Sequence, residues 1–281
     1  MPERSARNIY QTYKESLQQI YSREEAESLT LMLLNRYLGL KRRDLLLQKP
    51  VALIPPDLPE ALNALLKGMP IQYIFGEAAF FGRDFMVNSD VLIPRNETEE
   101  LVNMVIKRHR GRSRILDIGT GSGCIAVTLS LELSESEVFG MDVSRTALEV
   151  ARANALKLKA RVSYFLADVL TEPLPEQDLD LIISNPPYVR TMDKATMHVN
   201  VLDHEPHLAL FVADDDPLVF YRAIAIKGRH HLKSGGYIYF EINEALGAAV
   251  RALLSSCGYP QVHIEKDLNG KDRFAWAVNP G

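Results

Sequence analysis

The sequence Ser-Asn-Pro-Pro-Tyr follows directly on residues 179–183, an apolar run that is typical of a short strand buried on both faces. Pro186 has no amide hydrogen and Pro187 restricts the residue before it, so the backbone here is stiff and extended, with its polar groups facing outward. The side-chain oxygen of Asn185 and the carbonyl of Pro186 are then two acceptors beside the ring of Tyr188. Such a set can hold a planar NH2 group by accepting both of its hydrogens. The alternative is a strand that ends in a proline turn, with the tyrosine only packed.

A glycine-rich loop that follows an apolar run and opens a helix is a second candidate site. Its candidate cofactor-binding residues are Gly119, Thr120, Gly121, Ser122 and Gly123. Glycines let the backbone turn tightly and lie against a ligand, although a tight turn alone requires the same residues. Cys124 stands where a dinucleotide fingerprint has its third glycine, and the loop lacks the Lys-Ser/Thr pair that binds nucleoside triphosphates.

Acidic residues at the ends of the next two predicted strands indicate an adenosine ligand. Asp142 lies about 20 residues beyond the loop, where a carboxylate can accept both hydroxyls of a ribose, as it also would for NAD. Asp168 can accept from the exocyclic amine of an adenine while Val169 packs on the ring. Acids after two successive strands favour an adenosine without a pyrophosphate, and S-adenosylmethionine is such a ligand. The local alternatives are that Asp142 only caps a helix and that Asp168 is only a turn residue.

The elements that must position these residues alternate between strand and helix from residue 114 onward. Strands are predicted at 115–118, 138–141, 162–166, 179–183 and 236–242, helices at 124–133, 145–158, 217–232 and 245–257, and two closing edge strands at 261–266 and 273–278. This alternation predicts an α/β domain with a mostly parallel sheet and helices on both faces. Ligands of such sheets bind outside the carboxyl ends of the strands, at the switch point between the first and fourth strands. Asn185 is therefore expected to face the sulfonium of the cofactor and to contribute to its binding.

The N-terminal part of the chain has a different pattern, with apolar residues at helical spacing. Helices are predicted at residues 9–21, 23–38, 42–47 and 59–67. We interpret residues 1–75 as a small all-helical domain, residues 76–90 as a β-hairpin linker and residues 91–281 as the catalytic domain. Residues 71–76 belong to a β-rich run, and Asn96 is the expected N-cap of the helix that follows the hairpin, with Glu99 completing a capping box.

Composition and charge exclude several classes of protein. The 32 basic and 36 acidic residues give a formal net charge of −4 without a long basic run, so no direct nucleic-acid binding is expected. Cys124 and Cys257 form no CxxC pair, and no apolar stretch approaches the length of a membrane span. We expect a cytoplasmic protein without a disulfide framework. A group of possible metal ligands matches no standard spacing, and no metal is expected: His198, Asp203, His204, Glu205 and His207.

Five motifs occur together in this chain. They are Pro-Ile-Gln-Tyr-Ile at 70–74, Val-Leu-Ile-Pro-Arg at 91–95, Asp-Ile-Gly-Thr-Gly-Ser-Gly at 117–123, Ser-Asn-Pro-Pro-Tyr at 184–188 and Asp-Leu-Asn-Gly-Lys-Asp-Arg at 267–273. This combination resembles the release factor glutamine methyltransferases, the PrmC or HemK family. The Asn-Pro-Pro-Tyr motif alone is shared with DNA adenine and some ribosomal RNA methyltransferases. The chain departs from the family pattern in having Asn96 in place of proline, Asn243 in place of glycine and Val169 in place of an aromatic residue.

The resemblance implies a class I S-adenosylmethionine-dependent methyltransferase with a Rossmann-like fold. Its implied activity is methylation of the side-chain amide nitrogen of the glutamine in the Gly-Gly-Gln motif of class-I peptide chain release factors, in translation termination. The helical N-terminal domain would help to dock the factor, Glu205 and Pro206 would belong to a loop near the site, and a monomer is expected. The implied catalytic residues are Asn185, Pro186 and Tyr188, and Pro187 joins them in binding the substrate. A nucleic-acid amino-group methyltransferase with a flipped base in the same pocket and a noncatalytic cofactor-binding scaffold are the alternatives.

Overall fold

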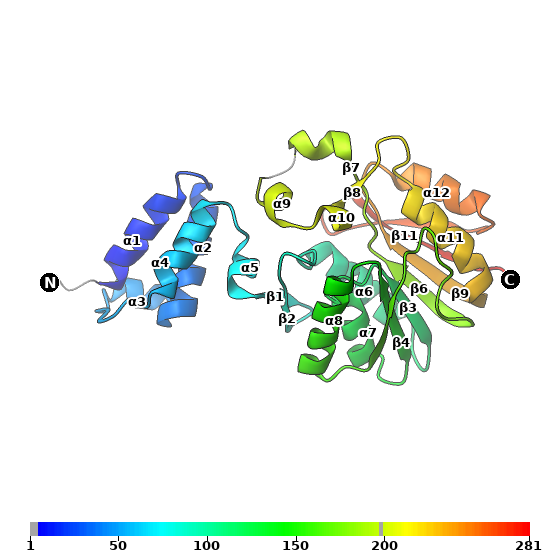
Figure 1. Ribbon diagram of the computed structural model, residues 1–281, viewed down its shortest axis with the longest axis horizontal. Helices are drawn as coiled ribbons and strands as arrows, with labels where there is room; N and C mark the ends of the chain where they lie inside the picture. Colours follow the sequence, from blue (N-terminus) through cyan, green and yellow to red (C-terminus); the bar gives the residue numbers. More distant parts are fainter. Residues whose placement is uncertain (1–4, 197–198) are drawn as a thin grey trace. The chain divides into compact units, whose positions relative to one another are not determined.

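The computed structural model of the chain describes residues 5–196 and 199–281 (Figure 1). These residues divide into two compact units. The smaller unit comprises the chain up to Phe75 together with Val199–His204, and the larger unit comprises the remainder from Gly76 onward. Within the described ranges, no helix is long and apolar enough to cross a membrane.

The smaller unit is all-helical and has a buried core of its own. Its helices are α1 (Ala6–Leu17), α2 (Arg23–Leu38), α3 (Arg42–Leu46), α4 (Asp57–Leu66), α5 (Ile71–Phe75) and α9 (Val199–His204). Helix α2 has the predicted bounds, because Ser22 caps its first turn and Gly39 ends it with a φ of +65°. Helix α1 begins earlier than predicted, since the hydroxyl of Ser5 accepts the amide hydrogen of Asn8. Helix α9 joins this unit through a hydrogen bond of 3.4 Å from Asn200 Nδ2 to the hydroxyl of Tyr21.

The region around residue 75 differs in part from the prediction. Residues 71–75, which the sequence predicted to be β-rich, form the single-turn helix α5. The hairpin itself is present as strands β1 (Glu77–Phe80) and β2 (Arg83–Met86), which pair antiparallel. It lies within the larger unit, where Asn154 bonds to both the amide and the carbonyl of Met86, at 2.6 and 2.9 Å.

The larger unit is built on a seven-stranded sheet with the order β10-β11-β9-β6-β3-β4-β5. Its strands are β3 (Arg114–Ile118), β4 (Glu137–Asp142), β5 (Val162–Leu166), β6 (Leu179–Ser184), β9 (Leu232–Glu241), β10 (Val262–Lys266) and β11 (Asp272–Val278). Strands β3, β4, β5, β6 and β9 are parallel, whereas β11 and β10 close the sheet as an antiparallel pair. The predicted mostly parallel sheet is confirmed, and β6 lies beside β3 at the predicted switch point.

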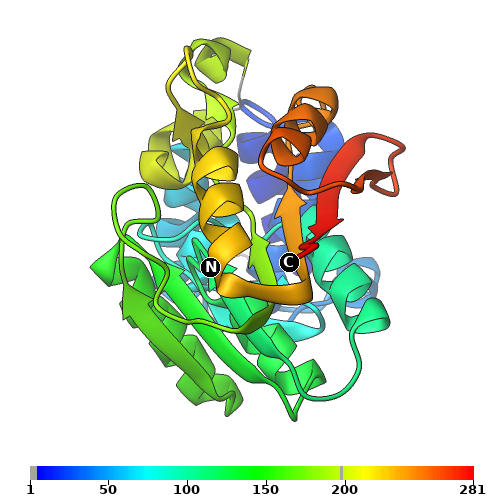
Figure 2. The ribbon, with the colours of Figure 1, turned by 90° about the vertical axis from the view of Figure 1, so that its right-hand side faces the viewer.

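Helices cover both faces of this sheet. Helices α6 (Asn96–Arg108), α7 (Cys124–Glu132) and α8 (Arg145–Leu158) pack on one face, and α11 (Val219–His231) and α12 (Gly247–Ser256) pack together on the other (Figure 2). Side chains of β6 alternate between the two cores, with Leu181 and Ile183 facing α6 and α7 and Ile182 facing α11. The fold is therefore a three-layer α/β arrangement whose parallel strands all end at one edge.

The start of α6 corrects one prediction. Asn96 is the first helical residue, and Arg95 is the N-cap without a side-chain cap bond. Glu99 does not complete a capping box, because its carboxylate accepts the amide hydrogen of Phe81 at 2.7 Å. The predicted N-cap is wrong because the helix already includes Asn96, and the predicted box is absent because Glu99 bonds to the hairpin instead.

Short elements fill the stretch after β6, in which no periodic pattern is visible. They are β7 (Val189–Arg190), the 3-10 helix η1 (Thr191–Thr196), α10 (His207–Leu210) and β8 (Phe211–Val212), with β7 and β8 paired in parallel. Elements this short carry too few residues for a helical or strand period to be visible.

Candidate active site

A pocket of about 240 Å³ lies at the carboxyl ends of the parallel strands in the larger unit. Most of the residues predicted for the site line it: Gly119, Gly121, Asp142, Asp168, Val169, Asn185, Pro186 and Pro187. Other lining residues, among them Asp90, Leu92, Leu208 and Phe220, were not singled out from the sequence. The remaining predicted residues do not line it: Thr120, Ser122, Gly123 and Tyr188.

The glycine-rich loop presents two of its glycines to the pocket. Gly119 and Gly121 have φ angles of +73° and +53°, and a Cβ atom at either position would meet open space. The third glycine serves packing instead, because a Cβ on Gly123 would lie 2.9 Å from the hydroxyl of Tyr164 and 3.1 Å from Cβ of Ala151. The loop therefore exposes backbone without side chains to the pocket, and its third glycine allows α7 to pack closely against α8.

Thr120 and Ser122 turn away from the pocket and support the loop. The hydroxyl of Thr120 donates to the carboxylate of Asp117 at 2.6 Å, and the carbonyl of Ser122 accepts from Asn154 at 2.9 Å. Asp117 is fully buried, and this burial raises the pKa of its carboxyl group to about 7. The side chain of Thr120 and the backbone of Ser122 therefore have a structural role beneath the predicted cofactor loop.

Asp142 connects the end of β4 to the glycine-rich loop. One of its oxygens accepts the amide hydrogen of Gly121 and the other that of Ser144, both at 2.9 Å. Burial raises the pKa of this carboxyl group. Ser144 itself caps α8 by accepting from Ala147, so the alternative in which Asp142 is only that helix's cap is wrong. A carboxylate has about four lone-pair sites, so Asp142, which also accepts from the backbone of Val143, keeps at least one for a further donor.

Asp168 combines a turn with a place in the pocket wall. Its oxygens accept from the amide of Leu170 at 2.8 Å and from the hydroxyl of Thr171 at 3.2 Å, as the turn alternative predicts. It also lines the pocket, next to the buried side chain of Val169. The local role and the predicted ligand-binding role are therefore compatible at this residue.

On the opposite wall, Asn185 belongs to a chain of hydrogen bonds that the sequence did not reveal. Its side-chain nitrogen donates to the hydroxyl of Thr98 at 3.2 Å, and that hydroxyl donates to Glu241 at 2.6 Å. Tyr188 donates its own hydroxyl to the other oxygen of Glu241 at 3.3 Å. Burial raises the pKa of both Tyr188 and Glu241. Glu241 ends a parallel strand, as Asp142 does, and this position was the signal that could have identified it.

Two further polar groups hold the surrounding loops. Glu205 is buried and accepts from the amide of Ile93 and from the guanidinium of Arg95 at 3.3 and 2.6 Å, beside Pro206 in the pocket wall.

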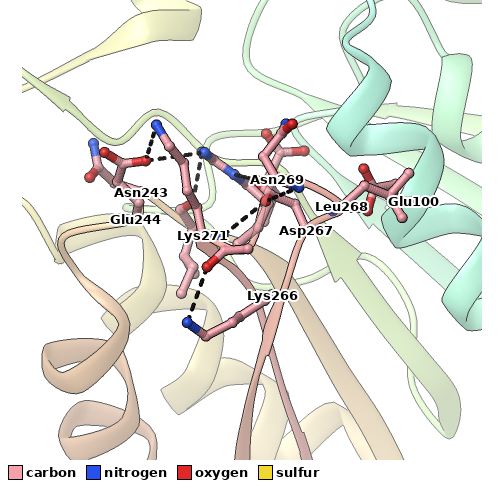
Figure 3. A network of polar contacts seen from close by, with 12 residues as sticks. Glu100, Asn243, Glu244, Lys266, Asp267, Leu268, Asn269 and Lys271 are labelled. Carbon is pink, nitrogen blue, oxygen red and sulfur yellow. Dashed lines mark hydrogen bonds and ion pairs between the residues drawn. The ribbon is translucent and has the colours of Figure 1, made fainter.

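The turn before β11 is organised by Asp267, which accepts from two backbone amides of its own turn and, at 3.2 Å, from Arg273 (Figure 3). Arg273 in turn favours the charged form of Glu241.

Among the described residues there is no group of three or more His, Cys, Asp and Glu side chains that could hold a metal ion. The group of possible metal ligands considered from the sequence, for which no metal was expected, includes His198, which lies outside the described residues. Glu205 of that group is engaged by Arg95, and His204 lies 3.4 Å from the carbonyl of Lys67.

The pocket fits an adenosine-type cofactor. Open space over Gly119 and Gly121 leaves room that a side chain would fill, and Asp142 supplies a charged acceptor at the end of the second strand. Aliphatic side chains, including Val169 and Ile224, provide an apolar wall. This donor and acceptor set suits hydroxyl groups and a flat ring better than a phosphate, because no lysine or arginine lines the pocket among the described residues.

Comparison with known proteins identifies close relatives. Residues 96–208 match a family model described as the methyltransferase small domain. The release factor glutamine methyltransferase of Bacteroides thetaiotaomicron is 44% identical over 268 residues, which cover 94% of this chain and 96% of that protein. The protein of the same name from Flavobacterium psychrophilum is 42% identical over 276 residues, covering 95% and 97%.

Solved structures support the fold assignment. A methyltransferase from Pyrococcus furiosus matches with a TM-score of 0.52 and 20% identity, over 72% of this chain and 91% of that one. A 16S rRNA N2 G1207 methyltransferase from Thermus thermophilus, in complex with AdoMet and guanosine, matches with a TM-score of 0.51 and 17% identity, over 72% and 49%. At these identities the similarity shows the shared class I methyltransferase fold alone.

We predict that Asp142→Ala weakens the binding of S-adenosylmethionine by about 10- to 100-fold, because a charged hydrogen bond is worth roughly 1.5–3 kcal/mol. Isothermal titration calorimetry measures the effect. Glu149→Ala is the control, since it removes the same charge from an exposed position on α8. Unchanged affinity in Asp142→Ala would remove this residue from the cofactor site.

We also predict a pH dependence of stability that originates in Asp117. Its folded-state pKa of about 7 lies above the value of about 3.9 expected in the unfolded chain, so this residue's contribution is present at low pH and is lost as the pH rises through 7. Between pH ~5.5 and pH ~8 the free energy of unfolding should fall by about 2 kcal/mol from this group alone. Asp117→Asn should lack that component in denaturant unfolding at the two pH values. A variant with the same pH dependence as the wild type contradicts the assignment.

Proposed function

This chain belongs to the family of release factor glutamine methyltransferases, and from this premise we propose that it methylates the glutamine side-chain amide in the Gly-Gly-Gln motif of class-I peptide chain release factors. The observation that carries the proposal is the meeting of two predicted half-sites in one pocket. Asp142 and the glycine-rich loop form one wall, and Asn185 and Pro186 form another. A methyl donor and an amide acceptor require such an arrangement of neighbouring sites.

The proposed donor is S-adenosylmethionine. When bound, it supplies a methyl group on a positively charged sulfonium, which is already activated for transfer. Asp142 would accept from the ribose hydroxyls, Asp168 from the adenine amine, and Val169 would pack against the ring. The branched side chain of Val169 offers less surface than an aromatic residue, so more of the affinity is expected to come from the two carboxylates and the glycine-rich loop.

The proposed role of Asn185 and Pro186 follows from the chemistry of the acceptor. An amide nitrogen is a weak nucleophile because its lone pair is delocalised into the carbonyl, a resonance reflected in a rotation barrier of about 18–20 kcal/mol. Asn185 and the Pro186 carbonyl can each accept one hydrogen of the substrate NH2 group, which fixes the direction of its lone pair. Pro187 keeps this backbone rigid, and Tyr188, held through its hydroxyl by Glu241, supplies an aromatic surface for the glutamine side chain.

The partner assignments belong to the same proposal. The all-helical unit contributes to docking of the release factor, and the enzyme acts as a monomer in the cytoplasm, where release factors are found. The all-helical unit has a buried core of its own, which supports an independent structural role for it. This core is formed by residues such as Leu17, Leu33, Leu34 and Leu58.

A nucleic-acid amino-group methyltransferase is the second candidate and is not favoured. The same pocket could receive a flipped base, but the chain is acidic overall, with a formal net charge of −4. Its relatives at 42–44% identity carry the name of the release factor enzyme. Transfer of labelled methyl groups to purified release factor, with ribosomal RNA and DNA in parallel, compares the two candidates directly.

We predict that Asn185→Ala lowers kcat/KM for release factor methylation by about 100-fold or more, the scale observed when one preorganised active-site hydrogen bond is lost. The affinity for S-adenosylmethionine and the Tm should change little, because the adenosine contacts lie on the other wall. Near-normal turnover after this substitution would refute the amide-holding role and favour the nucleic-acid alternative.

A chain that begins at Gly76 tests the docking role of the helical unit. We predict that its kcat/KM on full-length release factor falls by about tenfold or more, equivalent to roughly 1.4 kcal/mol of lost binding free energy. On a short Gly-Gly-Gln peptide the shortened and full chains should be equal. Retained cofactor affinity shows that the larger unit is intact, and equal efficiency on both substrates would contradict the docking role.

A further inference from the structure

We propose that Thr98 and Glu241 are positioning residues that determine which end of the Asn185 amide faces the methyl acceptor. The identity of the acceptor as an amide rests on the proposed function. The three side chains come from α6, β9 and the end of β6, so residues distant in sequence meet at one point. The links are Asn185 Nδ2 to Thr98 Oγ1, 3.2 Å, and Thr98 Oγ1 to Glu241 Oε2, 2.6 Å.

The donor and acceptor at each link of this hydrogen-bond series follow from counting hydrogens. An ionised carboxylate carries none, so Glu241 can only accept. The hydroxyl of Thr98 has one hydrogen, and donating it to Glu241 leaves the oxygen only as an acceptor. Asn185 must therefore present its NH2 group to Thr98, and its carbonyl oxygen is left to accept from the substrate. The two ends of an asparagine amide have nearly the same shape, so hydrogen bonding is what selects between them.

Burial raises the pKa of Glu241, and the hydrogen bonds from Thr98 and Tyr188 together with the charge of Arg273 act against this, toward the ionised form that this pattern of donors and acceptors requires. Its side chain is 1% exposed, and Tyr188 donates to its second oxygen at 3.3 Å. The guanidinium of Arg273, held by Asp267, favours the negative charge, whereas burial and Glu97 oppose it. Tyr221 donates to the backbone carbonyl of the same residue at 3.1 Å. The two hydrogen bonds made to the carboxylate oxygens of Glu241, from Thr98 and Tyr188, are both donations, which is what a carboxylate without a proton needs.

The consequence is selectivity for an acceptor that carries hydrogens. With the carbonyl of Asn185 turned to the pocket, a substrate NH2 group finds an acceptor beside the Pro186 carbonyl. With the opposite orientation, two NH2 groups would face each other and one donor of the substrate would be left unpaired. Thr98 and Glu241 thereby act on catalysis through Asn185, without touching the substrate themselves.

Thr98→Val tests this inference, because valine has the shape of threonine without the hydroxyl. We expect kcat/KM for methylation of purified release factor to fall by about 10- to 100-fold, and Thr98→Ser to recover most of the activity. The control is Thr128→Val, which removes the hydroxyl of a buried threonine on α7 that makes no hydrogen bond, and which should leave activity unchanged. The Kd for S-adenosylmethionine and the Tm are measured for every variant.

Combining Thr98→Val with Asn185→Ala separates positioning from general damage. Once the amide is gone nothing is left to orient, so Thr98→Val should add almost no further loss in that background. Three outcomes would each overturn the inference. The activity losses of the two substitutions could multiply in the double variant, the serine variant could be no more active than the valine variant, or Thr98→Val could have wild-type activity.

A second measurement needs no substrate and so is independent of the proposed function. The side-chain NH2 signals of Asn185 in the ¹⁵N spectrum, assigned by their loss in Asn185→Ala, should show slow hydrogen exchange in the wild type and in Thr98→Ser. Thr98→Val should accelerate that exchange, and equal exchange in all three proteins overturns the inference. A wild-type enzyme that transfers no methyl group to release factor refutes the proposed function instead, and the exchange data still decide the role of Thr98.

Discussion

One buried carboxyl group organises the acceptor side of this site. Glu241 ends β9 inside the protein and accepts from Thr98 on α6 and from Tyr188 after β6. Removing a carboxylate from water costs several kcal/mol unless donors replace the lost solvent. The helix, the proline-containing segment and the turn that places Arg273 are therefore tied to the same group, and their relative positions depend on its being fully paired.

The cofactor side could be predicted from the sequence because its signals are local. Helix α8 and strand β5 have the predicted bounds, and the residues at the strand ends, Asp142 and Asp168, line the pocket as the rule for parallel sheets requires. Strand and helix periods, glycines before a helix and acids after a strand are all visible within a few residues. Parallel strands then bring these short signals to one edge of the sheet.

The parts that could not be predicted depend on packing between distant segments. Thr98 lies in the first turn of a helix and has no distinctive local pattern; its role exists only because α6 lies against the end of β9. The carboxylate of Glu99 accepts a hydrogen bond from the backbone of Phe81 after the first hairpin strand, so the expected capping box does not form. Helix α9 lies in sequence between strands β7 and β8 of the larger unit yet belongs to the helical unit, an assignment that only tertiary contacts reveal.

The way Asp142 is held has a consequence for competition between the methyl donor and the demethylated product of the reaction. Both of its oxygens accept backbone N–H groups of the protein, so the loop needs no ligand to order it, and little affinity is lost to ordering on binding. The contacts proposed for Asp142, Asp168 and Val169 all engage the adenosine half of the donor, which the demethylated product retains unchanged. Under the proposed contacts, donor and product are expected to compete for the same residues. From these proposed contacts, the rate of methylation is expected to depend on the ratio of methylated to demethylated cofactor.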